Sequence, residues 1–403
     1  WRKAACSRTL SCRMVLAIAT GQEGRAAQRT GALTVEDIRE CAHASQEWTT
    51  YFRKQSNRAP ILITYATDLP EVWVLGLSAA LHRMPLVVIG RGMRWGPGST
   101  RTGHRHSTGQ KLSGMMRGVQ MLQAVSPHSP LLFADAADVV VANPLDSDMI
   151  RLVHRLAAKV DVLFGGECDS FPRCYPALWG GSLYKNSAPH KQCVRHSPLC
   201  YPNTGLYLSR NASTALRTLH KWSKLVQAAT HPAERGEDQA GAHRLYASQE
   251  MNNLVVRTDW DASLFVNLFR CRISDRGSTK WLDHKMSMCS YIEYDPFKHL
   301  QVDWPTWRYV HNKTDGTQSV KQPLLIHANG VHSRLLQAVR EASTRPLDEL
   351  LQAGGADSRG VDEAAGWRKL FSRAPLDHPV WLIDSAAALG PFCSVTSVGA
   401  LRR

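Results

Sequence analysis

The 403-residue chain contains no run of 18 or more consecutive apolar residues, so its sequence shows no complete membrane-spanning helix. None of its ten cysteines forms a Cys-x-x-Cys pair, which argues against a structural zinc site. The net charge of +15 suits an acidic partner, yet the basic residues are scattered and no nucleic-acid-binding module is legible. With 43% hydrophobic residues and no internal repeat, the chain is long enough for one large α/β domain or two smaller ones.

Four cysteines lie close together in the sequence: Cys168, Cys174, Cys193 and Cys200. We expect disulfides among them if the compartment is oxidising. Asn211-Ala-Ser213 and Asn312-Lys-Thr314 are acceptor sequences for N-glycosylation, which are usable only in a secretory compartment. Residues 1–30 are rich in arginine and poor in acidic residues, which predicts a leader within residues 1–57, either a transit peptide or a disordered segment.

Short apolar runs alternate with amphipathic segments over about a hundred residues. They predict strands at 58–66, 85–89, 130–134 and 160–165, and helices at 68–83, 110–125 and 146–158. Residues 90–109 have no periodicity and predict a long loop. Further along, we expect a strand at 205–209, a helix at 212–228, a helix-to-strand passage at 248–257 and a strand at 324–327. This alternation predicts an open, mostly parallel sheet with helices on both faces, and with ligands at the carboxyl ends of its strands.

Asp135-x-x-Asp138 lies where an expected buried strand reaches this ligand edge. Two carboxylates at this spacing can converge on one hard divalent cation, Mg²⁺ or Mn²⁺, which can also bridge a diphosphate. His327 ends another apolar strand, and a neutral imidazole is a common third ligand for such a cation. The alternatives are that Asp138 caps a turn, that Asp135 faces solvent and that His327 is a hydrogen-bonded structural residue.

Two further features suit phosphate. Lys111 follows Thr108-Gly109-Gln110 at an expected helix N-terminus, where anions are favoured. Asn329 and Gly330 follow His327, and their backbone amides can approach a phosphate closely. A solvated surface lysine is the alternative for Lys111.

The order of these pieces resembles the glycosyltransferase domain of the procollagen-lysine hydroxylase/glycosyltransferase family, with the collagen galactosyltransferase-like enzymes as its relatives. The matching words are Ile63–Thr67, Trp95-Gly96, Gly109–Lys111, Leu132–Val140, Cys174–Pro176, Tyr201–Tyr207, Gln249, Asp259 with Leu264-Phe265, and His327–Gly330. They run in family order from about residue 60 to 335. The resemblance implies an A-type glycosyltransferase (nucleotide-diphospho-sugar transferase) fold with a Rossmann-like open sheet.

The resemblance also implies a UDP-sugar donor and Mn²⁺ (or Mg²⁺), with the metal held by Asp135, Asp138 and His327. Thr67 would lie by the uridine, and Trp95 would belong to the same donor site. Lys111, Asn329 and Gly330 would lie by the diphosphate. Asn203 and Thr204, with the glycine after them, match the family's Asn-Ser-Gly turn beside the transferred sugar.

The chain departs from the family pattern at three places. Ala137 replaces an aromatic residue that can stack on uracil, and Ser333 stands where the family has a lysine. Ala247-Ser248 replaces an acidic run before Gln249, which leaves Glu250 as the candidate catalytic carboxylate. No iron-dioxygenase domain follows, so lysyl hydroxylation is not predicted.

The predicted organisation is a leader (1–57), a glycosyltransferase domain (58–338) and a C-terminal appendage (339–403). Within the domain, 58–165 is the nucleotide-sugar half and 166–338 the acceptor half with the last metal and diphosphate strand. The predicted activity is transfer of galactose or glucose to a hydroxyl of a protein, hydroxylysine-like, or of a glycan, in the lumen of the endoplasmic reticulum or Golgi. The alternatives are a catalytically degenerate relative that binds a glycan or protein, and a nucleic-acid binder resting only on charge.

Overall fold

The computed structural model describes residues 50–52, 59–66, 72, 75–76, 78–79, 82, 84–91, 104–167, 188–193, 196–197, 199–229, 238–249, 251–268, 296–303, 306–312, 316–328, 380–384 and 395–397. None of the helices in these segments is long and apolar enough to cross a membrane.

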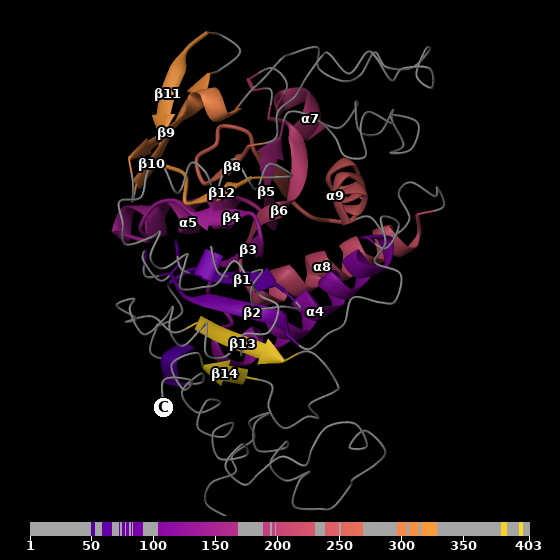
Figure 1. The fold of residues 1–403 in the computed structure, drawn as a ribbon. Helices are drawn as coiled ribbons and strands as arrows, with labels where there is room; N and C mark the ends of the chain where they lie inside the picture. The colour runs from indigo at the N-terminus through magenta and orange to yellow at the C-terminus, as the bar shows by residue number, and fades with distance from the viewer. Residues whose placement is uncertain are drawn as a thin grey trace, which may run out of the picture.

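An eight-stranded sheet in the order β14-β13-β2-β1-β3-β6-β5-β7 forms the centre of the described chain (Figure 1). Its strands are β1 (Ile61–Tyr65), β2 (Leu86–Arg91), β3 (Leu131–Asp135), β5 (Val162–Glu167), β6 (Tyr201–Ser209), β7 (Val256–Asp259), β13 (Val380–Asp384) and β14 (Val395–Ser397). All run parallel except β6 and β14, which are antiparallel to their neighbours. The predicted open, mostly parallel α/β sheet is confirmed, and it is compatible with a Rossmann-like fold.

Helices cover both faces of the sheet, as predicted. The side chains of Ile61 and Ile63 pack with α4 (His104–Val125), α8 (Ala212–Gln227) and α9 (Asp238–Ala247). Leu62, which points to the other face, packs with α5 (Ser147–Lys159). Because both faces are buried, the central strands read as continuous apolar runs instead of alternating ones.

The helix starts show which sequence signals were sufficient. The side chain of Asp146 accepts hydrogen bonds from the backbone N–H groups of Asp148 and Met149, so α5 begins where predicted. Asn211 caps α8 in the same way, which places one glycosylation acceptor sequence at a helix start.

The predicted loop at 90–109 is wrong over its last residues, because α4 begins at His104. A single glycine such as Gly109 costs a helix interior only about 1 kcal/mol, so it does not stop the helix. Gly114 and Gly118 bring α4 close to the sheet, since a Cβ atom at either position would overlap Tyr65 or Ile89. This close approach brings Lys111 to the end of β3.

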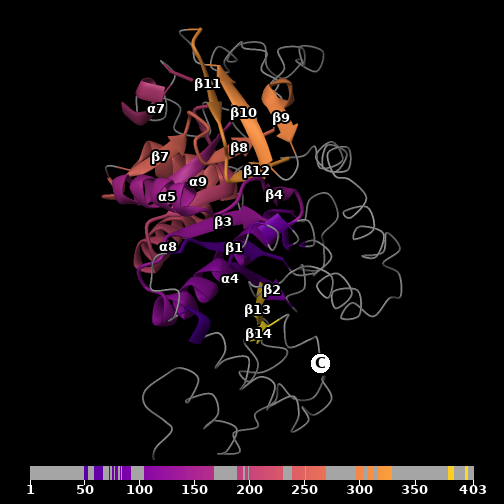
Figure 2. The same cartoon turned by 90° about the vertical axis from the view of Figure 1, so that its left-hand side faces the viewer.

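Two small sheets lie above β3 and β1 in the view of Figure 2. In the first, β12 (Leu325–His327) pairs antiparallel with β4 (Val139–Val141) and parallel with β8 (Phe265–Asn267). The second is antiparallel and contains β9 (Leu300–Asp303), β10 (Thr306–Asn312) and β11 (Gln318–Lys321). The predicted strand at 324–327 is thus confirmed.

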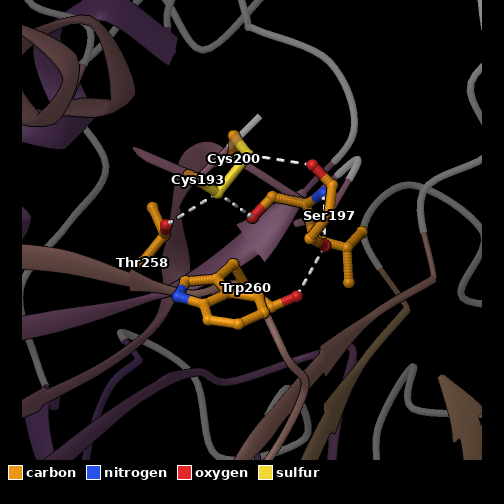
Figure 3. The surroundings of a disulfide bond; sticks show 6 residues. Cys193, Ser197, Cys200, Thr258 and Trp260 are labelled. Atoms are coloured by element: carbon orange, nitrogen blue, oxygen red, sulfur yellow. Dashed lines mark hydrogen bonds between the residues drawn. A yellow bond between two sulfur atoms is a disulfide. The ribbon is translucent and has the colours of Figure 1, made fainter. Parts of the chain in front are cut away.

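A disulfide joins Cys193, the last residue of α7 (Ala188–Cys193), to Cys200, the residue before β6 (Figure 3). Both cysteines are buried. Between them, the Ser197 hydroxyl donates a hydrogen bond to the Trp260 carbonyl at 2.6 Å. The predicted disulfide within the cysteine cluster is confirmed for this pair, and Cys168 and Cys174 lie outside the described residues. The bond fixes the chain just before β6, the strand that carries Asn203.

Candidate metal centre

Asp135, Asp138 and His327 meet at the carboxyl edge of the central sheet. Asp135 is the last residue of β3, and Asp138 follows a bend just before β4. His327 ends β12 opposite Val139, and the backbone N–H of Ala328 donates to the Asp138 carbonyl at 2.7 Å. Nε2 of His327 lies 3.3 Å from Oδ1 of Asp138 and 3.7 Å from Oδ2 of Asp135. The predicted convergence of these three residues is therefore confirmed.

The geometry of these three side chains fits a divalent cation. One ligand atom from each lies within 4.8 Å of the other two. Adjacent ligands of an octahedral cation with bonds of about 2.1 Å are about 3 Å apart, so small movements would bring all three atoms into one coordination sphere. The side chain of His327 is 4% exposed, whereas those of Asp135 and Asp138 are 34% and 20% exposed. The group is therefore buried at the imidazole and open to solvent at the two carboxylates, where further ligands have access.

Lys111 does not lie where the sequence analysis expects it. It lies inside α4, not at the helix N-terminus. Its ammonium group lies 2.6 Å from Oδ1 of Asp135 and 3.1 Å from Oδ2 of Asp238. Burial lowers the pKa of Lys111, but the two carboxylates outweigh this effect and raise it overall. An ammonium has three N–H donors, and within the described part of the chain these two carboxylates engage two of them.

The pKa of the His327 imidazole is shifted by the same two effects, burial and nearby carboxylates. Burial lowers its pKa, but the negative charges of Asp138, Asp135 and Glu167 raise it above its ordinary value overall. The carboxylates therefore favour a proton on Nε2, the nitrogen that faces Asp135 and Asp138. A cation that binds there has to displace that proton.

A buried polar network continues from the candidate metal group. Glu167, at the end of β5, accepts hydrogen bonds from Nδ2 of Asn203 at 2.8 Å and from Nε2 of Gln239 at 2.5 Å. Oδ1 of Asn203 in turn lies 3.1 Å from Nδ1 of His327. Asn203, a predicted sugar-site residue, is thus brought to the centre. Thr204, the next residue of β6, is buried as well. The hydrogen bonds just described are made by Asn203.

Sequence reasoning missed Asp238 and Gln239, the first two residues of α9. The expected Gln249 lies elsewhere: its Oε1 accepts from the backbone N–H of Val256, at the amino end of β7. The missed signal was the acidic run before a glutamine at Glu237-Asp238-Gln239. That run has the acid-then-glutamine pattern of the resembled family, which Ala247-Ser248 lacks before Gln249.

Several predicted site residues lie outside the described residues: Thr67, Trp95, Glu250, Asn329 and Gly330. Their roles stay predictions. Ala137, which stands where the family resemblance predicts a uracil-stacking aromatic residue, is exposed in the bend between Asp135 and Asp138. The described centre therefore contains the metal group, Lys111 and Asn203, but not the rest of the predicted donor site.

Comparison with known proteins does not extend this description. No protein-family model matches the chain. No curated protein matches it either.

Proposed function

We propose that the chain is a divalent-metal-dependent glycosyltransferase with an A-type fold, which moves galactose or glucose from a UDP-sugar to a hydroxyl acceptor. The observation that carries this proposal is the convergence of Asp135, Asp138 and His327 at the carboxyl edge of the sheet. Ligands bind at this edge in open α/β sheets. The resemblance of the matching words to the procollagen-lysine glycosyltransferase domain supports the same activity.

In this proposal, Asp135, Asp138 and His327 hold Mn²⁺ (or Mg²⁺), which neutralises charge on the departing diphosphate when it is bound. Lys111 keeps the Asp135 carboxylate in place and offers its third N–H to a phosphate oxygen. Glu167 and Asp238 are buried carboxylates beside the centre, and they hold Asn203, Gln239 and Lys111 in place. Asn203 orients Glu167, and Thr204 lies on the same strand.

The acceptor and the compartment are further parts of the proposal. We expect a hydroxylated protein or glycan as acceptor, bound in the half formed by residues 166–338. The buried Cys193–Cys200 disulfide supports an oxidising compartment, such as the lumen of the endoplasmic reticulum or Golgi.

One observation favours a second candidate, a degenerate relative that binds a glycan or protein. Ala137 offers no ring on which uracil can stack. The departure at Ser248 carries less weight, because its hydroxyl donates to the Arg244 carbonyl and Asp238 supplies an acid at the centre.

The test is release of UDP from a panel of UDP-sugars, with Mn²⁺ and then with EDTA. The Asp135→Ala/Asp138→Ala double variant is the comparison, and Asp148→Ala, on the exposed face of α5, is the control. Mn²⁺-dependent release that the double variant loses would support the enzyme and identify the donor. UDP binding without turnover of any donor would favour the degenerate relative. Absence of both would exclude a nucleotide-sugar site.

A further inference from the structure

The ring nitrogen of His327 that faces away from the aspartates lies against two amide oxygens. Nδ1 is 2.9 Å from Oδ1 of Asn267 and 3.1 Å from Oδ1 of Asn203. An amide oxygen only accepts hydrogen bonds. Both contacts are favourable only if Nδ1 carries a hydrogen.

The orientation of each amide is fixed by its other contacts. Nδ2 of Asn267 donates to the carbonyl of Gly166 at 3.0 Å, so the opposite orientation would set two oxygens against each other. Nδ2 of Asn203 donates to the Glu167 carboxylate, and Oδ1 accepts from the backbone N–H of Gly205 at 2.8 Å. Reversing Asn203 would break both bonds at once. The two oxygens therefore face Nδ1 for reasons that lie outside the histidine.

A hydrogen on Nδ1 determines what the other nitrogen can do. In the neutral ring it leaves the lone pair on Nε2, the atom that lies 3.3 Å from Asp138 and 3.7 Å from Asp135. The opposite tautomer would direct an N–H at the carboxylates and leave no nitrogen ligand for a cation.

The backbone of β6 limits movement of the ring. A Cβ atom at Gly205 would overlap three ring atoms of His327, namely Cε1, Nδ1 and Nε2. The imidazole therefore lies directly against the strand. On its other side, His327 and Asn267 are register partners in β12 and β8, so Asn267 is held next to the ring by strand pairing.

We propose that Asn267, together with Asn203, is a positioning residue that holds His327 in the Nδ1–H tautomer and thereby makes Nε2 the metal ligand. This inference rests on the metal site of the proposed function. Outer-shell partners of this kind orient ligating histidines and raise their basicity. Asn267 is the residue to test, because Asn203 also bonds Glu167 and has a proposed part in the sugar site.

Two variants of Asn267 separate positioning from a structural role. In Asn267→Leu the side chain keeps its approximate size but has no acceptor for Nδ1–H. In Asn267→Asp a carboxylate oxygen accepts from Nδ1–H, although a buried charge is added. The same pair of changes at Asn252 is the control, since Asn252 bonds Ser248 beyond the end of α9.

The measurement is the dissociation constant for Mn²⁺ alone, by titration calorimetry, without UDP-sugar and with thermal unfolding recorded for each protein. We expect Asn267→Leu to weaken Mn²⁺ binding by about 10-fold to 100-fold, the usual cost of losing an outer-shell partner. Asn267→Asp should bind Mn²⁺ more tightly than Asn267→Leu even where it lowers the melting temperature. The Asn252 variants should bind Mn²⁺ as the wild type does.

Two results would overturn the inference. The first is wild-type affinity in Asn267→Leu, and the second is an Asn267→Asp variant that binds no better than Asn267→Leu. If the wild-type chain binds no Mn²⁺, both the inference and the metal part of the proposed function fail. If the wild type binds Mn²⁺ but turns over no UDP-sugar, only the proposed function fails, and the comparison of the two variants still decides the inference.

Discussion

Acidic residues lie at both ends of the central strands, but the two ends differ in how the negative charge is compensated. At the amino end, Asp161 precedes β5, and its side chain is 8% exposed. One oxygen lies 2.8 Å from the Arg217 guanidinium, and the other accepts from the backbone N–H of Val255 at 2.8 Å. This acid has a cation and a backbone donor of its own, so it is satisfied within the chain.

At the carboxyl end, negative charge exceeds positive charge. Among the described residues of the centre, one lysine and one histidine face four carboxylates: Asp135, Asp138, Glu167 and Asp238. Such an excess costs folding free energy unless something positive binds. The comparison separates an acid that is satisfied within the fold from a group of carboxylates whose excess charge suits the proposed cation site.

Asp138→Asn should break the comparison most strongly. We expect Mn²⁺ affinity to fall by more than about 100-fold, because losing a direct ligand costs more than losing an outer-shell partner. Stability in EDTA should change by no more than about 1 kcal/mol, since removal of one repulsive charge offsets the lost interaction with His327. Calorimetry and thermal unfolding check these two outcomes. Unchanged Mn²⁺ affinity would exclude Asp138 as a ligand.

Added Mn²⁺ should raise the free energy of unfolding by binding at the carboxyl end of the strands. The size of this gain should not depend on Asp161 at the amino end. A ligand present at about 100 times its dissociation constant adds about 2.7 kcal/mol to the free energy of unfolding. Urea unfolding with Mn²⁺ and with EDTA measures this difference. It should vanish in Asp138→Asn and persist in Asp161→Ala. The same gain in both variants would mean that the ion binds elsewhere.

Asp161→Ala tests the other end. We expect it to lower the free energy of unfolding by about 2 kcal/mol, because it leaves the backbone N–H of Val255 and the Arg217 guanidinium without their shared acceptor. Arg217→Ala should cost less, since that guanidinium is half exposed and is solvated in either state. Urea unfolding gives both values. Weakened Mn²⁺ binding in Asp161→Ala would show that the two ends are not independent.

The pH dependence of metal binding tests the protonation of the centre itself. Burial lowers the pKa of His327, but Asp138, Asp135 and Glu167 raise it overall, so Mn²⁺ competes with a proton on Nε2. Affinity should rise with pH by up to about tenfold per unit while the ring is protonated, and level off above its pKa. Calorimetry from about pH 6 to about pH 8, in buffers of different ionisation enthalpy, measures the displaced proton. A flat profile without proton release would contradict a protonated His327.

The sequence was sufficient for the metal group because strand ends can be read from local pattern. A buried strand that stops at Asp135 and an apolar run that stops at His327 locate both residues at a sheet edge. The cap at Asp146 is equally local. In each case a few neighbouring residues determine the result, and no distant contact has to be known.

The missed residues depend on contacts between distant parts of the chain. Helix α9 is buried nearly all round and has no amphipathic pattern. Its Gly241 packs where a Cβ atom would overlap Trp222 and Val226. Asp238 therefore gave no helical signal, although it lies 3.1 Å from Lys111. Asn267 was overlooked for a similar reason, since its value depends on the pairing of β8 with β12.

Gly205 affects how natural variants of this chain should be interpreted. Any side chain at this position would push against the imidazole of His327, so a variant can retain Asp135, Asp138 and His327 and still have a displaced imidazole. If the proposed function holds, such a variant would lose its metal site while all three proposed ligands look intact in its sequence. The cause would then be found at a glycine that is not itself a proposed ligand.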